Sequence, residues 1–468
     1  MPPFFSVLLL AALAWGAFAF GAVYDWCYTP LFWACAGIGA LGLVAPGARY
    51  RRPIEWSVVA GLVVILAAAL VQTIPLSPGT IVRISPATDA FLRTFNIAYV
   101  NAAASGYRHP MSIDPPGTWL GIAALGSLGL LLVGTARGLG RRSLGVLAGG
   151  LVLLGLLLAL AGIVQSGLYG RDPSPTEKIY GFWKPIFQAY PFGPFVNRNH
   201  FAGWMLLALP VSIGYFFGLV SRAMRGVKPT LRDRVLWFSS SGASQVVLVG
   251  LAVIVMGVSL VLTLSRSGTS CFVLALAISA WFVMRHQTTG SRRKVLLVYI
   301  ALVAALSLGW VGIDRILERF ALASGNDFAQ RVAAWKDAWN VFLNFPWFGT
   351  GLNTYGTATL VFQTFGRDTG HFVEAHNDYV QILAEGGLLL ALPALLAILL
   401  LAREITRRFA EGNDDPTTYW LRVGATTGLV AIAFQEIVEF SLQIPGIAAL
   451  FAVVAGIAIH RVPRSGNV

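Results

Sequence analysis

Apolar residues of this chain fall into repeated blocks, and shorter segments between the blocks hold most of the polar residues. Each block has roughly 20 residues, the length of helix that spans the hydrocarbon core of a bilayer. Such blocks must be helical, because lipid offers no partner to free backbone groups. The pattern therefore predicts an all-α polytopic membrane protein with about 12 transmembrane helices in one membrane domain, 1–468. The predicted helices are 4–22, 29–47, 54–72, 118–134, 144–164, 200–219, 244–264, 269–284, 295–312, 377–402, 423–440 and 444–460.

Composition excludes a soluble protein. Of the 468 residues, 56% are hydrophobic and 12% are charged, whereas a soluble domain has about 25% charged residues. The first block lacks a basic n-region and is long for a signal sequence, so we expect it to be a retained helix. The three cysteines, Cys27, Cys35 and Cys271, follow neither metal-site spacing nor a disulfide framework. We expect no metal site and no cofactor.

Basic residues set the predicted orientation. With the N-terminus inside, the inner segments hold 21 of the 34 Lys and Arg residues, and the outer segments hold 13. This positive-inside bias predicts that both termini are cytoplasmic. It also explains the net charge of +13 without a nucleic-acid partner. The inner segments are 48–53, 135–143, 220–243, 285–294, 403–422 and the tail from 461.

The outer segments 73–117, 165–199 and 313–376 are long and rich in polar and aromatic residues, so we expect function at the outer face. The largest, 313–376, lies between the ninth and tenth predicted helices. It contains an amphipathic helix pattern, with Arg331 and Asp337 on the polar side. This helix either covers a cavity that opens to lipid or packs on the bundle. Its apolar positions, spaced by three and four residues, are Phe328, Val332, Trp335, Trp339, Phe342 and Phe345.

Two arginines stand at helix ends on the outer side. Arg198 lies in the segment Asn197-Arg198-Asn199-His200, at the outer mouth of the sixth predicted helix. Arginine keeps its charge and can hold a diphosphate bidentately, and its neighbours are suited to phosphate or sugar oxygens. The alternative is a snorkelling arginine at the interface. Arg266 lies in the tight hairpin 265–268, where a charge near the membrane is a functional hypothesis unless it is paired.

A histidine and its polar neighbours begin the tenth predicted helix. His376 is a candidate general base because histidine accepts a proton near neutral pH. Asn377 and Asp378 follow it directly and are candidates to orient the ring or bind substrate. The other outer histidines, His109, His200 and His371, compete for the role of base.

Three acidic residues lie within or at the ends of predicted helices. Glu385 is farther along the tenth helix, and Glu436 and Glu439 share a face near the outer end of the eleventh. Acids inside a membrane mark cavities or proton paths.

In combination, these motifs resemble the O-antigen ligase and O-antigen polymerase superfamily of bacterial membrane glycosyltransferases. The resemblance covers most of residues 160–400 and includes the large loop before the tenth helix. Beyond the histidine, Leu388, Leu389 and Leu390 depart from the signature of the ligases. The match is therefore to the superfamily more than to a true ligase. The residues that carry the match are Asn197 to His200, Ser265 to Gly268, Arg331 with Trp335, Pro346 to Leu352, His376 to Tyr379 and Glu385 to Gly387.

The resemblance implies a mechanism at the periplasmic face of the bacterial inner membrane. The donor is a glycan on undecaprenyl diphosphate, and the acceptor is a glycolipid or glycan. Arg198 and Arg266 hold the diphosphate. His376 takes the proton of the acceptor hydroxyl, and the acceptor oxygen attacks the anomeric carbon and inverts it. No metal ion takes part. Further residues expected to bind substrate are Asn197, Asn199, His200, Arg331, Asn377, Asp378 and Glu385.

Two alternatives stay open. Within the superfamily, the protein is a polysaccharide polymerase or a protein O-oligosaccharyltransferase. In another class, it is a proton-coupled transporter that uses Glu385, Glu436 and Glu439 as a relay. Transporters often show two repeated halves, and this chain shows no such repeat.

Overall fold

The computed structural model of the chain is helical. It describes residues 3–44, 55–101, 106–169, 178–186, 190–223, 241–286, 290–312, 325–364, 366, 370–412 and 414–461. Across these residues the only β pairings are isolated bridges, such as Leu76 with His109. The helices are α1 (Phe4–Phe18), η1 (Phe20–Ala22), α2 (Asp25–Val44), α3 (Trp56–Val71), α4 (Pro78–Ile84), α5 (Pro86–Phe95), α6 (Ile97–Val100), α8 (Pro115–Gly138), α9 (Arg141–Tyr169), α10 (Arg198–Ala223), α12 (Ser241–Leu262), α13 (Arg266–His286), α14 (Gly290–Val311), α16 (Gly325–Asn344), α17 (Tyr355–Phe362), α18 (Asp378–Glu411), α19 (Pro416–Gln435), η3 (Ser441–Gln443) and α20 (Pro445–Ile459).

The protein is a polytopic helical membrane protein. Among the described residues, eight helices are long and apolar enough to cross a bilayer, and α1, α3 and α20 are shorter apolar helices. Every predicted block corresponds to a helix, although several ends move. The largest shift is at the end of α18, which continues to Glu411 where the prediction ended at 402. α19 begins at Pro416 rather than at 423 because the Asp415 side chain caps its first turn. The number of spans stays a prediction.

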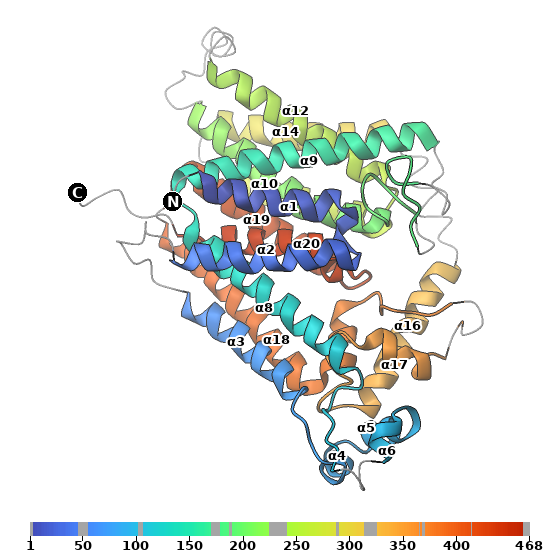
Figure 1. The fold of residues 1–468 in the computed structure, drawn as a ribbon. Helices are drawn as coiled ribbons and strands as arrows, with labels where there is room; N and C mark the ends of the chain where they lie inside the picture. Colours follow the sequence, from blue (N-terminus) through green and yellow to red (C-terminus); the bar gives the residue numbers. More distant parts are fainter. Residues whose placement is uncertain are drawn as a thin grey trace.

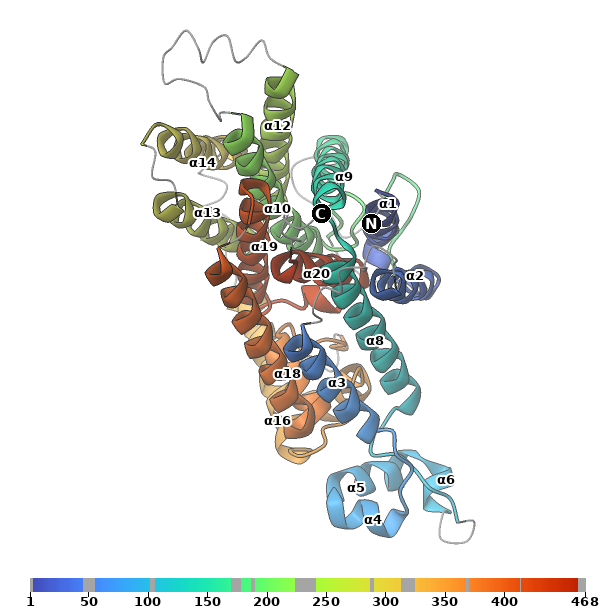
Figure 2. The same ribbon diagram turned by 90° about the vertical axis from the view of Figure 1, so that its left-hand side faces the viewer.

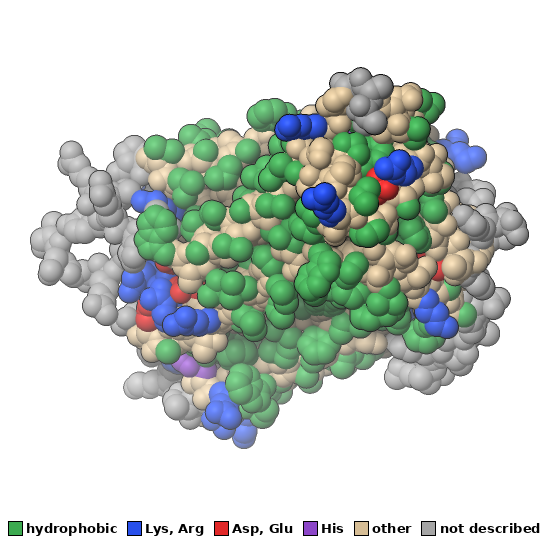
Figure 3. Space-filling model, turned by 90° about the horizontal axis from the view of Figure 1, so that it is seen from below, with side chains coloured by type: hydrophobic (Ala, Val, Ile, Leu, Met, Phe, Trp, Pro, Cys, Tyr) green, Lys and Arg blue, Asp and Glu red, His purple; other side chains and the backbone are tan. Residues whose placement is uncertain are grey.

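The long helices run side by side, with the smaller helices α16, α17 and α4 to α6 gathered at one end (Figure 1). α1 begins at the opposite end, where Ser6 Oγ donates to the carbonyl of Ser143 at the start of α9. Figure 2 shows α4 to α6 projecting beyond α3 and α8. On the face drawn in Figure 3, hydrophobic side chains cover much of the middle, a group of Lys and Arg lies at the left, and other basic side chains lie at the upper centre and the right. A broad hydrophobic surface of this kind suits contact with lipid.

The centre of the bundle is α10, which is buried along its length and packs against α19. Their backbones touch at Gly214 and Gly424, where a Cβ would clash with the carbonyls of Trp420 and Pro210. Small residues allow this close approach, which is how helices in lipid gain packing energy. The two helices thereby fix the start of α10 beside the end of α19.

α18 is interrupted in its third turn, at Gly387, and the large loop fills the break. Gly387 has φ +54°, and the amides of Leu388 and Leu389 donate to the carbonyls of Pro346 and Trp347 at 2.8 and 2.9 Å. Backbone irregularity at membrane depth is tolerated where protein satisfies it. The break therefore anchors the loop that follows α16.

The predicted helix of the large loop exists as α16, but its buried face differs from the predicted one. Phe328 and Trp339 are exposed, whereas Ala334, Ala338 and Asp337 are buried. Asp337 accepts hydrogen bonds from the amide and hydroxyl of Thr364, so it packs inward although the pattern placed it on the polar side. Small residues allow α16 to lie close to α18, while Phe328 and Trp339 point away. Phe345, at the end of the predicted apolar face, is buried as expected.

Candidate functional site

One buried carboxylate joins four segments that are far apart in the sequence. Glu439 lies between α19 and η3 and is 1% exposed. Its Oε1 accepts hydrogen bonds from Asn199 Nδ2 at 2.9 Å, Arg331 Nη2 at 2.6 Å and Ser267 Oγ at 3.4 Å. Its Oε2 lies 4.0 Å from Nδ1 of His376. The motifs that carry Asn199, Ser267, Arg331 and His376 therefore meet at Glu439.

The first motif starts α10. Asn197 precedes the helix, and its Oδ1 accepts from the amide of Asn199 at 2.9 Å. Arg198 is the first helical residue and is half-buried, with its guanidinium over the ring of Tyr190 at 5.0 Å. An aromatic face stabilises a cation without neutralising it. His200 is buried, and its Nε2 has no hydrogen-bond partner in the described part of the chain.

The second motif starts α13. The Ser265 hydroxyl accepts from the amide of Gly268 at 3.2 Å and so ends the hairpin. A Cβ at Gly268 would clash with Ala202 on α10, so the starts of the two helices are in contact. Arg266 is half-buried at the first position of α13. Asn199 and Ser267, which directly follow the two arginines in the sequence, both donate to Glu439 Oε1. Both arginines therefore begin their helices at one site.

The third element is Arg331 of α16. It is 27% exposed and forms the shortest of the contacts with Glu439. The ion pair between Arg331 and Glu439 holds the large loop over the starts of α10 and α13. The helical pattern predicts Arg331 on the polar side of the helix, and in the structure this side chain points toward the bundle.

The fourth element is His376, which precedes α18 in a left-handed conformation with φ +52°. That conformation is unusual for a residue other than glycine and is often found at functional sites. Its carbonyl accepts from Nε1 of Trp335 on α16 at 3.2 Å. The rings of His376 and His200 each pack edge-on against Phe440 at 4.8 Å, so the two candidate bases flank one phenylalanine.

The residues after His376 hold the backbone. The Asn377 side chain caps α18 by accepting from the amides of Tyr379 and Val380. Asp378 accepts from Nε2 of Gln443 at 2.6 Å, and its amide donates to the carbonyl of Glu436. α18 is thereby tied to the segment that carries Glu439.

Glu385 is placed away from Glu439, in the second turn of α18. It accepts from the amides of Asn353 and Tyr355 at 2.7 and 3.1 Å and from Nε2 of Gln381 at 3.0 Å. Gln381 in turn accepts from the amide of Ala375, next to His376. Glu385 therefore binds the large loop, and Gln381 extends the network toward the site.

The other outer histidines are engaged elsewhere. His109 contacts the carbonyl of Pro110 through Nδ1, and its ring lies against Tyr99. His371 contacts Thr359 and the carbonyl of Gly356. Of the four candidate bases, only His200 and His376 reach Phe440.

Burial controls the protonation of the site. Burial and, as the smaller effect, the positive charge of Arg331 together lower the pKa of His376 to about 4. Burial raises the pKa of Glu439, and Arg331 opposes that rise. Burial and the Asp378 carboxylate raise the pKa of Glu436 well above its usual range. At neutral pH the His376 ring is uncharged, as a general base must be.

Within the described ranges, no group of three or more His, Cys, Asp or Glu side chains has an arrangement that could hold a metal ion. The cationic groups at the site are arginines. Arginine is the residue that binds phosphate oxygens in a fixed planar geometry.

Sequence analysis did not include Glu439 among the residues of the glycosyltransferase site. The signal was present in part, because an acid at a helix end in a membrane is unusual. Its partners are 240, 172 and 108 positions away along the chain, so only the packing of α10, α13 and α16 reveals them.

Part of the chain matches a known protein family. No curated protein matches the chain. Residues 251–395 match a family model described as O-antigen ligase. The matched segment includes Arg266, Arg331, His376 and Glu385. Over this segment, which is less than half of its length, the chain is similar to the O-antigen ligase family.

Proposed function

We propose that this protein transfers a glycan from undecaprenyl diphosphate to an acceptor hydroxyl at the periplasmic face of the bacterial inner membrane. The observation that carries the proposal is the convergence on Glu439 of three segments bearing arginine and one bearing histidine. Helix ends that carry arginine beside a neutral imidazole suit a reaction in which a diphosphate leaves and a hydroxyl loses its proton.

In the proposed reaction, Arg198 and Arg266 bind the diphosphate of the donor. The acceptor oxygen attacks the anomeric carbon while His376 takes its proton. The bond between that carbon and the diphosphate oxygen breaks, and the electron pair leaves with undecaprenyl diphosphate. The anomeric carbon is inverted, and the fixed arginine charges stabilise the developing negative charge without a metal ion.

The substrate-binding roles of Asn197, Asn199, His200, Arg331, Asn377, Asp378 and Glu385 belong to the same proposal. The structure engages several of these side chains with protein: Asn377 caps α18, and Glu385 binds the large loop. For these two we favour a role in holding the site over direct contact with the glycan.

The acceptor is a glycolipid, a growing polysaccharide or a protein, and the same site serves a ligase, a polymerase or a protein O-oligosaccharyltransferase. Glu385 and Glu439 are each bound by three hydrogen-bond donors of neighbouring segments. Carboxylates tied in this way favour a fixed catalytic site over the mobile relay of a proton-coupled transporter.

The test is transfer by the purified protein from a lipid-diphosphate-linked glycan to candidate acceptors, with products identified by mass spectrometry. His376→Ala should reduce transfer about 10²–10⁴-fold, the usual contribution of a general base. Donor binding should survive, since Arg198 and Arg266 remain. Near-normal transfer by His376→Ala, together with an inactive His200→Ala protein, would assign the base to His200 instead.

A further inference from the structure

A cavity of about 390 Å³ lies at the end of the bundle opposite to Glu439. It is formed by the last turns of α13 and α18 and the start of α19, with lining residues Trp281, Phe282, Arg285, His286, Phe409, Gly412, Asp414, Pro416 and Tyr419. α13 begins at the candidate site and ends at this cavity, and its 21 residues span roughly 30 Å. That length is about the thickness of a bilayer core, so the cavity faces the other leaflet.

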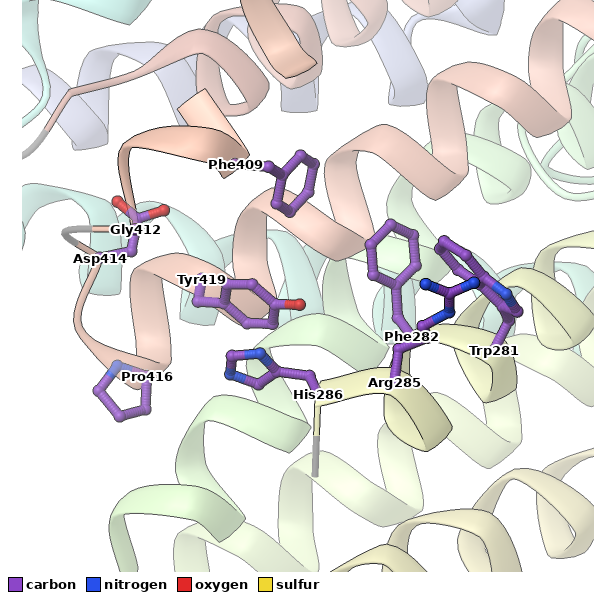
Figure 4. Close-up of a pocket in the computed structure, with 9 residues that line it drawn as sticks. All are labelled: Trp281, Phe282, Arg285, His286, Phe409, Gly412, Asp414, Pro416 and Tyr419. Atoms are coloured by element: carbon purple, nitrogen blue, oxygen red, sulfur yellow. The ribbon is translucent and has the colours of Figure 1, made fainter. Parts of the chain in front are cut away.

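The walls of the cavity are aromatic (Figure 4). Phe282 stacks on Phe409 with ring centroids 5.5 Å apart, and His286 stacks on Tyr419 at 3.7 Å. Trp281 contacts Phe282 and is 47% exposed on the outside of the helix. An aromatic surface that opens sideways at a helix end is typical of the headgroup level of a membrane.

The rim of the cavity is basic. Arg285 is exposed and lies over the ring of Trp281 at 5.1 Å, and the described residues offer it no carboxylate partner. Asp414 also lines the cavity, but Arg422 binds both of its oxygens, at 2.9 and 3.0 Å. The acidic residue is therefore already paired, and the charge of Arg285 is left for an anion.

We propose that this cavity binds an anionic phospholipid of the leaflet at this end of the bundle, separately from the proposed glycan-transfer site. The phosphate lies against Arg285 and His286, because guanidinium groups match phosphate oxygens. The upper part of an acyl chain lies along Trp281, Phe282 and Phe409. Under the orientation given by the positive-inside bias, this is the cytoplasmic leaflet, whose surface is rich in anionic lipid.

Charge complementarity distinguishes this occupant from a neutral lipid, and the aromatic wall distinguishes it from free phosphate. A zwitterionic headgroup offers Arg285 a phosphate together with a cation, which reduces the attraction. Inorganic phosphate leaves the rings of Trp281 and Phe282 without a partner. A lipid that combines a net negative headgroup with acyl chains satisfies both surfaces.

The experiment uses the full chain in nanodiscs of phosphatidylcholine, to which phosphatidylglycerol with brominated acyl chains is added. Bromine quenches nearby tryptophan, and the Trp281→Phe protein gives the signal of the remaining tryptophans. The Trp281 component should be quenched at lower mole fractions by brominated phosphatidylglycerol than by brominated phosphatidylcholine. Arg285→Ala should raise the half-quenching fraction about tenfold, the loss expected for one charged hydrogen bond, and Arg285→Lys should recover part of it.

The matched control is Arg142→Ala, which removes an exposed arginine near the start of α9 at the same end of the bundle. It should leave the quenching curve unchanged. Equal quenching by the two lipids, or an Arg285→Ala curve that coincides with that of the native protein, would overturn the proposal. Displacement of the lipid by inorganic phosphate at similar concentration would also overturn it, because the aromatic wall would then contribute nothing.

Discussion

The imidazole Nδ1 of His376 lies 4.0 Å from Oε2 of Glu439, and neither atom has a hydrogen-bond partner among the residues that the structure describes. A small movement of the ring brings the two atoms into hydrogen-bond distance. The carboxylate would then hold the proton on Nδ1 and leave Nε2 free to accept one, as in other histidine–carboxylate pairs. Arg331 occupies the other oxygen of the same carboxylate.

Glu439→Gln should therefore reduce transfer about 10²–10⁴-fold, although the amide nearly preserves the shape of the side chain. It removes the charge that orients His376 and leaves the Arg331 guanidinium without its ion pair. Transfer rates of the purified variants, compared at saturating donor, measure the effect. Glu436→Gln is the matched control, since Glu436 is an equally buried acid three positions away with no basic partner among its contacts. Equal losses in both proteins would assign the effect to packing.

The pH dependence of transfer should show that His376 is hard to protonate. Burial and Arg331 lower its pKa to about 4, so the neutral base persists as pH falls below the ordinary histidine value of 6.5. We expect kcat/KM to stay level at neutral pH and to fall only as pH approaches 4. Because the unfolded chain takes up the proton earlier, the stabilising contribution of this group is complete above pH 6.5 and is lost as pH falls through 4.

Arg331→Ala tests the cause of that shift. Removing the positive charge removes one of the two effects that lower the pKa of His376. The fall of kcat/KM on the acid side should therefore occur at a higher pH, while burial keeps it below pH 6.5. The readout is the pH at which kcat/KM falls, because the size of kcat/KM also reflects any loss of donor binding. If kcat/KM falls at the same pH in the variant and in the native protein, Arg331 does not act on the pKa of His376.

Arg198→Ala and Arg266→Ala should each abolish measurable transfer by weakening the engagement of the diphosphate. Lysine at either position keeps the charge but loses the planar geometry, so it should restore only part of the activity. Transfer should persist in EDTA, because the proposed charge stabilisation comes from arginines. A strict requirement for a divalent cation would contradict that assignment. Thermal unfolding of the variants controls for misfolding, since both residues begin helices of the bundle.

The proposed orientation places the site and the lipid cavity on opposite sides of the membrane. Single cysteines at positions 198, 266 and 376 should react with an impermeant reagent applied from the periplasm. Cysteines at positions 141 and 292, in the predicted inner segments, should react only after the membrane is opened. Labelling of position 141 from outside would show that the predicted topology is inverted and that the site does not face the periplasm.

The sequence predicts the helices well because burial in lipid imposes the same length and polarity on each of them. The blocks 200–219 and 269–284 fall within α10 and α13, with ends extended by a few residues. Such features depend on local sequence and on the bilayer alone. The cap of α18 was not predicted, because the sequence suggested that Asn377 orients the His376 ring or binds substrate.

What the sequence could not predict depends on which helices meet. The spacing of Phe328 and Trp339 indicated an apolar face, but membrane and protein are both apolar surroundings, so hydrophobicity does not tell which face packs on protein. The role of Glu439 requires the starts of α10 and α13 to touch, and glycine at position 268 permits that contact. The break at Gly387 becomes stable only with Pro346 and Trp347 docked on it.

The docking of the large loop on α18 supplies the last prediction. Gly349 has φ +65°, and a Cβ there would clash with the backbone carbonyl of Glu385. Around this contact, the buried Gln72 donates to the carbonyls of Phe348 and Glu385 at 2.6 and 2.9 Å. Gly349→Ala should therefore destabilise the docked loop by at least about 1–3 kcal/mol, the cost of a left-handed conformation alone.

The loop carries α16 and Arg331, so its release should lower transfer as well as protection of the loop amides from hydrogen exchange. Gly370→Ala is the matched control, because it lies in the same loop with open space around its Cα and an ordinary backbone conformation. It should leave both measurements unchanged. Faster exchange in Gly349→Ala with normal transfer would mean that the site does not need the docked loop, and Arg331 would lose its assigned role.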